Sequence, residues 1–484
     1  MTPFAVIVAS LAGYVVLLLG VGRLAARRPS NALFFTARRE AAWYTVWPAM
    51  ITAAMSGITL LSVPGSVAED GFSYLQMVAG FTVGQLLVAF WLVPLFYRLR
   101  LTSLYEYLAQ RFGPRSQRTG AWFFFLSKLA ASALKLYIVA TALQVLLFEP
   151  LGVPFWANAL LCAVIVWGYT LRGGVRSVLL TDWLKTLLIL ASVGVTIAAL
   201  MQAMDWSLWE GWQVVRESPM SQLFFFDDPA SDRYFWKMFL AGVVLLVAMT
   251  GLDQDMMQRN LSCRSVGDAQ RTILLTALCQ AVLIALMLVL GVLLYAYAEA
   301  RDLPLPARSD HLFPMVALDE GLPRVVAVLF VAGFAAAGFS SIGASLTALT
   351  TSVSVDIMRG KSLSEKDLSR LRMGVHTALA LLLFGCVLPI GYGANESAIN
   401  LIYRLAGYTY GPILGLFLFG LWSRWQVRDG WVWLPAVAGP LMTLLLQVVA
   451  RRLWQVEIGF ELLLYNALFV MVGLWLLRCR KATA

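Results

Sequence analysis

The sequence predicts an all-α polytopic membrane protein, and three observations support this. Of its 484 residues 60% are hydrophobic and only 13% are charged, against roughly 25% charged residues in soluble domains. Apolar runs of about 20 residues, long enough to cross a bilayer as helices, recur along the chain. The basic residues behind the net charge of +10 lie mainly between these runs. That placement indicates membrane orientation rather than nucleic-acid binding.

Each long apolar run predicts one membrane-spanning helix. A helix needs about 20 residues to cross the hydrocarbon core, and on this rule we expect about thirteen spans. They cover residues 3–22, 43–67, 73–97, 119–148, 155–171, 175–201, 235–257, 270–298, 323–355, 371–394, 398–421, 430–450 and 460–478.

The distribution of basic residues predicts how the chain is oriented. Arginines cluster after the first run, from Arg23 to Arg39, and after the third, from Arg98 to Arg118. Arg259, Arg264 and Arg271 are expected in a further loop on the same side, whereas the long 202–234 segment is acidic. Because basic loops stay in the cytoplasm, we expect the N-terminus outside, the C-terminus in the cytoplasm, and a multi-pass protein of the cell (inner or plasma) membrane.

Two of the apolar runs are interrupted. The second is broken at Ser56-Gly57 and again at Pro64-Gly65, and the seventh turns polar at Thr250-Gly251. Glycine and proline weaken a helix and leave carbonyl groups without intrahelical partners. Such backbone is tolerated at membrane depth only where it is buried in protein or lines a cavity. Paired breaks in corresponding places predict a binding site near the middle of the membrane.

The spacing of the two breaks predicts an internal repeat. They lie five spans apart, and an odd number of spans reverses the orientation of the second unit. We therefore expect an inverted repeat of two five-helix halves, residues 43–201 and 235–421. Residues 1–42 supply an extra helix and a cytoplasmic loop, and residues 430–484 supply two more helices. The whole chain, 1–484, is expected to form a single transmembrane domain.

The run from Phe334 to Ile357 is rich in small and hydroxyl-bearing residues. Ser340, Ser341 and Ser345 share one side of this predicted helix. One interpretation is a surface for close helix packing. The other is that these hydroxyls and the carbonyls freed by the first break form an all-oxygen shell for a small, hard cation, and neutral ligands suit Na⁺.

Asp182, Lys128 and Lys135 fall inside predicted spans, where a charge is costly and usually functional. Asp182 begins the sixth span and either contributes to a site or pairs with Lys185 or Arg176. Lys128 and Lys135 lie in the fourth span. Each either pairs with a carboxylate such as Asp253 or Asp255 or receives an acidic substrate. The candidates for hydrogen bonding to a polar solute, with helix packing as the alternative, are Thr59, Tyr74, Gln76 and Gln85.

Catalytic and metal-site patterns are missing from the sequence. The two histidines, His311 and His376, are far apart, and no HExxH, GxSxG hydrolase or P-loop pattern with its structural context occurs. The five cysteines are scattered singly and predict no zinc or redox centre. We therefore do not expect an enzyme.

Four separated stretches resemble the sodium:solute symporter family. They are AAMSGITLLSVPG, YTLRGGVRSVLLTDWLK, TGLDQDMMQRNLSCRSVGDAQR and AAAGFSSIGASLTALTTSVSVDI, in the order the family has them. The resemblance covers nearly the whole chain. It implies a LeuT-type 5+5 inverted-repeat fold with extra helices and transport by alternating access. It also implies a Na⁺ site built by Thr52, Met55, Ala337, Ser340 and Ser341, with Asp182 nearby.

Departures from the family pattern bear on ion number and substrate. Gly343 and Ala344 stand where relatives with a second Na⁺ have hydroxyls, which argues against a second ion. Ala54 replaces an aspartate of proline-transporting relatives. Relatives that transport sialic acid have an arginine in the helix that holds Lys135.

Together these observations predict Na⁺-coupled symport of a small polar solute into the cell. A sugar, a sugar acid such as sialic acid, or another carboxylate is expected, with the lipid bilayer and no nucleic acid as surroundings, and a monomer suffices. A proton-coupled carrier using Asp182 or Asp253 and a membrane solute sensor remain as alternatives. The residues expected to bind the solute are Ser56, Thr59, Tyr74, Gln76, Lys135 and Asp253.

Overall fold

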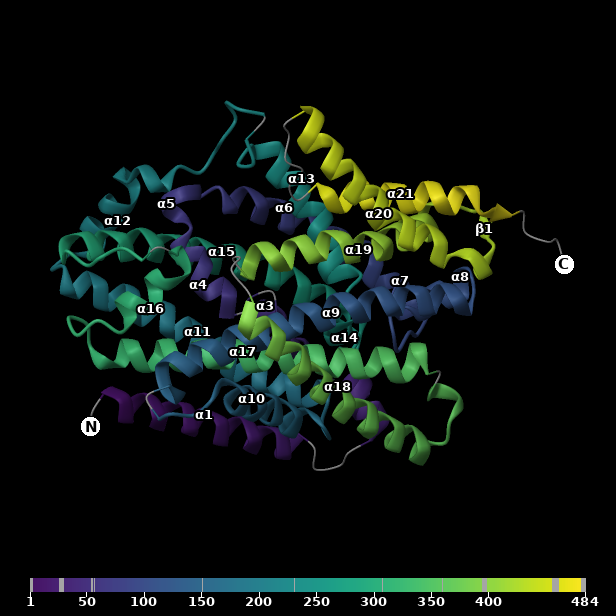
Figure 1. The fold of residues 1–484 in the computed structure, drawn as a ribbon, viewed down its shortest axis with the longest axis horizontal. Coiled ribbons are helices and arrows are strands. Elements are labelled where there is room, and N and C mark those ends of the chain that lie inside the picture. The colour runs from purple at the N-terminus through teal and green to yellow at the C-terminus, as the bar shows by residue number, and fades with distance from the viewer. Residues whose placement is uncertain are drawn as a thin grey trace.

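The computed structural model shows a bundle of helices that run side by side, most of them along one direction (Figure 1). The structure describes residues 3–25, 30–53, 55, 57–149, 151–229, 231–306, 308–358, 360–393, 398–454 and 461–479. Helix α1 lies along one edge of the bundle and helices α20 and α21 along the opposite edge (Figure 1). Helices α3, α9, α14 and α17 lie between these edges (Figure 1).

Helices occupy all the predicted spans. In chain order the main helices are α1 (Pro3–Ala25), α3 (Trp43–Ala53), α4 (Gly57–Gly65), α6 (Tyr74–Leu87), α7 (Val93–Arg98), α9 (Pro114–Leu143), α10 (Phe155–Thr170), α11 (Val175–Ala203), α13 (Phe235–Leu246), α14 (Gln254–Asn260), α15 (Val266–Ala300), α17 (Arg324–Ser352), α18 (Glu365–Gly393), α19 (Ala398–Trp422), α20 (Trp433–Val449) and α21 (Leu462–Leu476).

Short elements connect or extend these helices. They are α2 (Asn31–Thr36), α5 (Val67–Asp70), α8 (Glu106–Arg111), α12 (Leu208–Glu217), α16 (Leu312–Ala317), the 3₁₀ turns η1 (Ala37–Arg39), η4 (Pro219–Ser221), η6 (Ser309–His311), η8 (Gly360–Ser362) and η9 (Asp429–Trp431), and the π-helical segments η2 (Val88–Leu92), η3 (Gln144–Phe148), η5 (Val247–Gly251), η7 (Val353–Ile357) and η10 (Ala450–Trp454). One two-stranded antiparallel sheet pairs β1 (Gln426–Val427) with β2 (Arg478–Cys479).

The lengths of the helices define a multi-pass membrane protein. Among the described residues, eight helices are long and apolar enough to cross a membrane, and nine if Phe235–Gly251 and Gln254–Asn260 form one bent span. The other four predicted ranges lie on α3 with α4, on α10, on α19 and on α21. The total of thirteen spans and the orientation of the termini stay predictions.

Both predicted breaks occur in the structure. Helix α3 ends at Ala53 and α4 begins at Gly57, and Met55 between them is not helical. Helix α13 passes into the π-helical segment η5, which ends at Gly251, and α14 then leaves at an angle of 70°. Pro64-Gly65 does not divide the span further, because both residues form the end of α4.

Close backbone contacts at glycines fix the helices on one side of each break. A Cβ atom at Gly80 of α6 would lie 2.1 Å from the Phe239 carbonyl oxygen of α13, and one at Gly242 would lie 2.4 Å from that of Met77. Likewise a Cβ at Gly291 of α15 would lie 2.3 Å from the Pro64 carbonyl of α4. Small residues let membrane helices approach this closely. Helices α13 and α4 therefore pack directly on α6 and α15.

Candidate functional site

The two adjacent serines of α17 face two charged residues of α11. Ser340, Asp182 and Lys185 are fully buried, and Ser341 is 6% exposed. The Ser340 hydroxyl donates a hydrogen bond to Asp182 Oδ1, and Lys185 Nζ donates to Ser341 Oγ over 3.3 Å. Asp182 and Lys185 are three residues apart on a helix, so their side chains point to the same side. The serine pair thus connects a buried carboxylate and a buried ammonium group.

The first break lies against the same two helices. A Cβ at Gly57 would lie 3.2 Å from the Phe334 ring, one turn before Ala337 on α17. Thr186 of α11 donates a hydrogen bond to the Pro48 carbonyl oxygen of α3 over 3.1 Å. Met55, between α3 and α4, is buried to 1% exposure. The described part of the break is therefore next to the serine pair.

These groups are of the kind that a sodium ion binds. Ser340 and Ser341 carry hydroxyl oxygens, the sequence prediction adds the main-chain carbonyls of Met55 and Ala337, and hard cations take oxygen ligands. Asp182 Oδ2 is buried and receives no hydrogen bond from the described residues, although Arg259 Nη2 lies 3.4 Å away. A buried oxygen without a hydrogen bond is costly unless a cation or a donor satisfies it. The residues present fit Na⁺.

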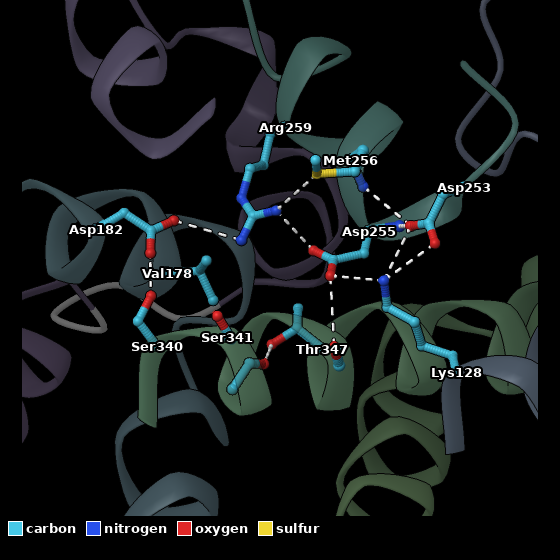
Figure 2. A network of polar contacts seen from close by, with 12 residues as sticks. Lys128, Val178, Asp182, Asp253, Asp255, Met256, Arg259, Ser340, Ser341 and Thr347 are labelled. Atoms are coloured by element: carbon cyan, nitrogen blue, oxygen red, sulfur yellow. Dashed lines mark hydrogen bonds and ion pairs between the residues drawn. The ribbon is translucent and has the colours of Figure 1, made fainter. Parts of the chain in front are cut away.

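A chain of ion pairs extends from this site to α9 (Figure 2). Arg259 of α14 lies between Asp182 and Asp255, with Nη1 2.8 Å from Asp255 Oδ1. Asp255 Oδ2 is 3.0 Å from Lys128 Nζ, and Lys128 Nζ is also 3.0 Å from Asp253 Oδ2. All five side chains are buried. Negative and positive side chains alternate in this series of ion pairs, which joins α11, α14 and α9.

Asp253 has three structural roles at the start of α14. Its side chain caps the helix by accepting from the backbone N–H groups of Asp255, over 2.8 Å, and Met256, over 3.2 Å. It also pairs with Lys128 and accepts a hydrogen bond from the Tyr410 hydroxyl of α19. A capping side chain replaces a helical partner that the first N–H groups lack. The polar residues after the second break thus begin a helix and bind α9 and α19.

The sequence prediction for Arg259 was wrong. We expected it in a loop with Arg264 and Arg271, but it lies within α14 and is only 2% exposed. Its position four residues after Asp255 was the signal, because oppositely charged residues at this spacing meet on a helix. We predicted a loop here because we used only the charge of this polar stretch after the broken span, and not the spacing of its charged residues. Asp182 pairs with this arginine and not with Arg176.

Lys135 differs from the buried cations Lys128, Lys185 and Arg259. It lies seven residues after Lys128 on α9, which places both on one side of the helix. It is partly buried, and within the described parts of the chain its ammonium group has no hydrogen bond or ion pair. The sequence left two alternatives for each lysine, an ion pair with a carboxylate or binding of an acidic substrate. Lys128 forms ion pairs, with Asp253 and Asp255. Lys135 keeps the possibility of binding an anion.

Other predicted solute-binding residues have partners elsewhere. Gln76 donates to the Arg233 carbonyl oxygen over 2.9 Å and accepts from the Phe225 N–H over 3.1 Å, so it anchors the segment between α12 and α13. Gln85 donates to Gln280 of α15 over 2.8 Å. Thr59 and Tyr74 are partly buried on α4 and α6. Ser56 and Ala54 lie outside the described residues, as does the side chain of Thr52.

A cavity of about 290 Å³ opens beside the beginning of α3 and α11. Tyr44 and Thr45 of α3 and Leu179 and Leu180 of α11 contribute to its wall. Arg176 and Arg264 lie at the same cavity. Leu179 is one helical turn before Asp182, so the wall of the cavity lies one turn of α11 away from that carboxylate.

Two broken helices that meet around buried polar groups are typical of membrane transporters. The model of the sodium:solute symporter family matches residues 34–433. This chain belongs to the sodium:solute symporter family. The predicted resemblance is confirmed over most of the chain.

Individual relatives agree with the family match. The chain is 26% identical over 398 residues to the human sodium/iodide cotransporter, covering 80% of this chain and 60% of that protein. It is 27% identical over 382 residues to the mouse sodium-coupled monocarboxylate transporter 1, covering 76% and 60%. The chain thus spans about three fifths of the length of these curated relatives.

The fold also matches a solved structure. A Na⁺-coupled sialic acid symporter in a substrate-bound, outward-open state superposes with a TM-score of 0.84. The match covers 97% of both chains at 20% sequence identity. At this identity the likeness establishes the fold.

Proposed function

We propose that this protein is a secondary active transporter that moves a small organic anion into the cell together with Na⁺ by alternating access. The observation that carries the proposal is Lys135, which has no ion pair with any residue that the structure describes and lies on α9 beside a buried ionic cluster that meets the serine pair. Family membership and the fit of the serine pair to Na⁺ support the coupling ion. Family members are transporters, which agrees with the expectation that the chain is not an enzyme.

The architecture we propose follows the sequence prediction. The chain forms thirteen spans with the N-terminus outside, and residues 43–201 and 235–421 form the inverted halves. The breaks at α3–α4 and α13–α14 support this proposal, because the predicted second and seventh spans contain them. Sodium is held by Thr52, Met55 and Ala337 through carbonyls and by Ser340 and Ser341 through hydroxyls, with Asp182 beside them. The cavity between α3 and α11 would then open to the cytoplasm and serve as the way out.

The charge of the buried cluster supports an anionic substrate. The buried side chains of Lys128, Lys185 and Arg259 balance the three buried carboxylates of Asp182, Asp253 and Asp255. Lys135, partly buried on α9 seven residues after Lys128, adds a fourth positive charge. The cluster therefore has one excess positive charge, and a bound Na⁺ adds a second. Uncompensated buried charge is strongly unfavourable. A carboxylate bound at Lys135, with Thr59 and Tyr74 and also Ser56 as further hydrogen-bonding candidates, would remove one of these charges.

The names of the relatives agree with an anion. Iodide and monocarboxylates are anions, and sialic acid carries a carboxylate. A neutral sugar, which the sequence left open, would bring no charge to Lys135. Asp253 and Gln76 have their side chains engaged by protein groups, so we assign them to the architecture rather than to the solute.

Uptake into proteoliposomes tests this function. Purified protein is given an inward Na⁺ gradient, and a lactate, a sialic acid, a glucose and a proline tracer are compared, with choline or a proton gradient replacing Na⁺ in parallel. We expect Na⁺-dependent uptake of an acid. Ser341→Ala should weaken the Na⁺ dependence. Uptake that is driven by protons without Na⁺ would contradict sodium coupling.

Lys135 variants test the substrate class separately. Lys135→Gln should raise the KM for the acid by about tenfold or more, because a hydrogen bond to a charged group contributes about 1.5–3 kcal/mol. Its half-saturating Na⁺ concentration should stay unchanged. Lys135→Arg keeps the charge and is the matched control. Saturable Na⁺-driven uptake of glucose, unaffected by Lys135→Gln, would leave the transporter proposal standing and overturn the anion.

A membrane potential imposed with potassium and valinomycin measures the net charge moved in each transport cycle. One Na⁺ with one monovalent anion carries no net charge, so an imposed potential should leave accumulation unchanged. A tenfold Na⁺ gradient would then support about tenfold accumulation, equal to about 1.4 kcal/mol. Each net positive charge moved through 100 mV would add about 2.3 kcal/mol.

A further inference from the structure

Lys185 is the only lysine of α11. Its ammonium group donates a hydrogen bond to Ser341, one of the proposed sodium ligands. Its Nζ lies 3.3 Å from Ser341 Oγ, and the whole side chain is buried to 0% exposure. Asp182, one turn earlier on the same helix, holds the neighbouring hydroxyl of Ser340. The serine pair is therefore bonded on one side to an anion and on the other to a cation of the protein itself.

The Ser341 hydroxyl has a limited set of directions in which it can accept. A hydroxyl oxygen has two lone pairs, and both an ammonium group and a sodium ion attach through them. Two monovalent cations at one hydroxyl in a buried site repel each other, because little solvent lies between them. Binding of Na⁺ at Ser341 therefore requires that the ammonium group withdraw.

We propose that Lys185 is an internal cation that competes with Na⁺ for the serine pair. This inference rests on the sodium site of the proposed function. When Na⁺ is absent, the ammonium group satisfies Ser341 and adds positive charge beside Asp182. When Na⁺ binds, Lys185 moves off the hydroxyl. The competition lowers the affinity for Na⁺ and keeps the empty site compensated, which favours release of the ion and return of the unloaded carrier.

Asp182 has a second cationic neighbour, Arg259, so a variant without the charge of Lys185 can still fold. Arg259 Nη2 lies 3.4 Å from Asp182 Oδ2, so the carboxylate remains paired when Lys185 is neutralised. Glutamine has almost the length of lysine without its charge. Lys185→Gln is thus expected to fold, and Lys185→Arg provides a variant that keeps the charge in place.

The test is a Na⁺ titration of the full-length protein in detergent without substrate, read by thermal stabilisation with choline chloride holding the ionic strength. For Lys185→Gln the half-saturating Na⁺ concentration should fall by about tenfold, since the lost contact is a hydrogen bond to a charged group. For Lys185→Arg it should stay at the wild-type value or rise. Net uptake by Lys185→Gln should be slower than exchange of internal for external substrate.

The outcomes separate this inference from the function it rests on. If Na⁺ stabilises the wild type and Lys185→Gln at the same or a higher half-saturating concentration, the competition is overturned and the sodium site stands. If Na⁺ stabilises neither protein, the sodium site itself fails. If Lys185→Gln does not fold, a Lys185→Arg value below that of the wild type contradicts the competition. Ser341→Ala, combined with each Lys185 variant, should remove the response and so locate it at the serine pair.

Discussion

The two broken helices are held alike on one side of the break and differently on the other. Helices α4 and α13 each lie against a glycine of a neighbouring helix, Gly291 or Gly80. Helix α14 contains Asp255 and Arg259, which form buried ion pairs with α9 and α11. Helix α3, with the sequence WYTVWPAMITA, contains no charged residue. Thr186 of α11 and Thr272 of α15 donate neutral hydrogen bonds to carbonyl oxygens of α3.

From this difference we infer that α14 is the fixed half-helix and that α3 is the one that moves. A buried ion pair costs several kcal/mol to break on one side, whereas a neutral hydrogen bond contributes about 1 kcal/mol. Helix α14 is therefore held firmly to the bundle. The hydrogen bond between α3 and α11 costs less to break, and what otherwise joins these two helices is uncharged packing. Since the cavity lies between these two helices, we expect α3 to be the element that opens it.

The largest effect is expected where the charge chain of α14 is cut. Arg259→Met removes the shared partner of Asp182 and Asp255 and leaves two buried carboxylates with less compensation. We expect the free energy of unfolding to fall by about 3–5 kcal/mol. Unfolding titrations in mixed micelles, together with the thermal midpoint, measure this loss.

The matched control for this change is Arg271→Met. Arg271 is an exposed arginine at the beginning of α15, and its replacement should change the stability by less than about 0.5 kcal/mol. Equal losses in both variants would mean that the buried chain does not fix α14, and the contrast between the two half-helices would then disappear.

A smaller effect is expected where α4 is held by backbone contact. Gly291→Ala places a methyl group 2.3 Å from the Pro64 carbonyl oxygen, so α15 and α4 must move apart. Overpacking of this kind costs about 1–3 kcal/mol. Gly194→Ala on α11 is the control, since its Cβ meets nothing within 4 Å and alanine is the better helix former. A thermal midpoint of Gly291→Ala that matches or exceeds that of the control would show that this contact does not hold α4.

Much of the fold could be predicted because membrane helices leave a strong pattern in sequence. Long apolar runs located the helices, of which eight or nine among the described residues are long and apolar enough to cross a membrane. The Ser56-Gly57 and Thr250-Gly251 interruptions located both breaks. Family membership was also predicted from motifs. Pairing of Lys128 with Asp253 and Asp255 was one of two stated alternatives, because a buried ammonium group needs a counter-charge.

The rest of the site depends on contacts between distant segments, which no local pattern contains. The sequence predicted a loop for Arg259, because α14 is a short polar helix. Its burial comes from α17, α3 and α11, which pack around it. The contact of Lys185 with Ser341 joins residues 156 positions apart. Gln76 looked available to a solute, but its amide is used by the backbone near Phe225 and Arg233.

The smallest effect is expected at the uncharged hydrogen bond between Thr186 of α11 and Pro48 of α3. Thr186→Val keeps the shape of the side chain and removes its hydrogen bond to the Pro48 carbonyl oxygen. The cost should be about 0.5–1.5 kcal/mol. Because the tie holds one half-helix, the loss should appear as faster amide hydrogen exchange in Trp43–Ala53, with little change in Gln254–Asn260.

Thr196→Val on the same helix is the control for this prediction. Its hydroxyl bonds only to the Ser192 carbonyl of α11 itself among the described residues, so its loss should leave exchange in α3 unchanged. If Thr186→Val accelerates exchange in α14 as much as in α3, the two half-helices open together and α3 is not the independent element. If it accelerates exchange in α3 alone, the neutral half-helix moves against a charged half-helix that stays in place, and the cavity beside Tyr44 and Leu179 widens by that motion.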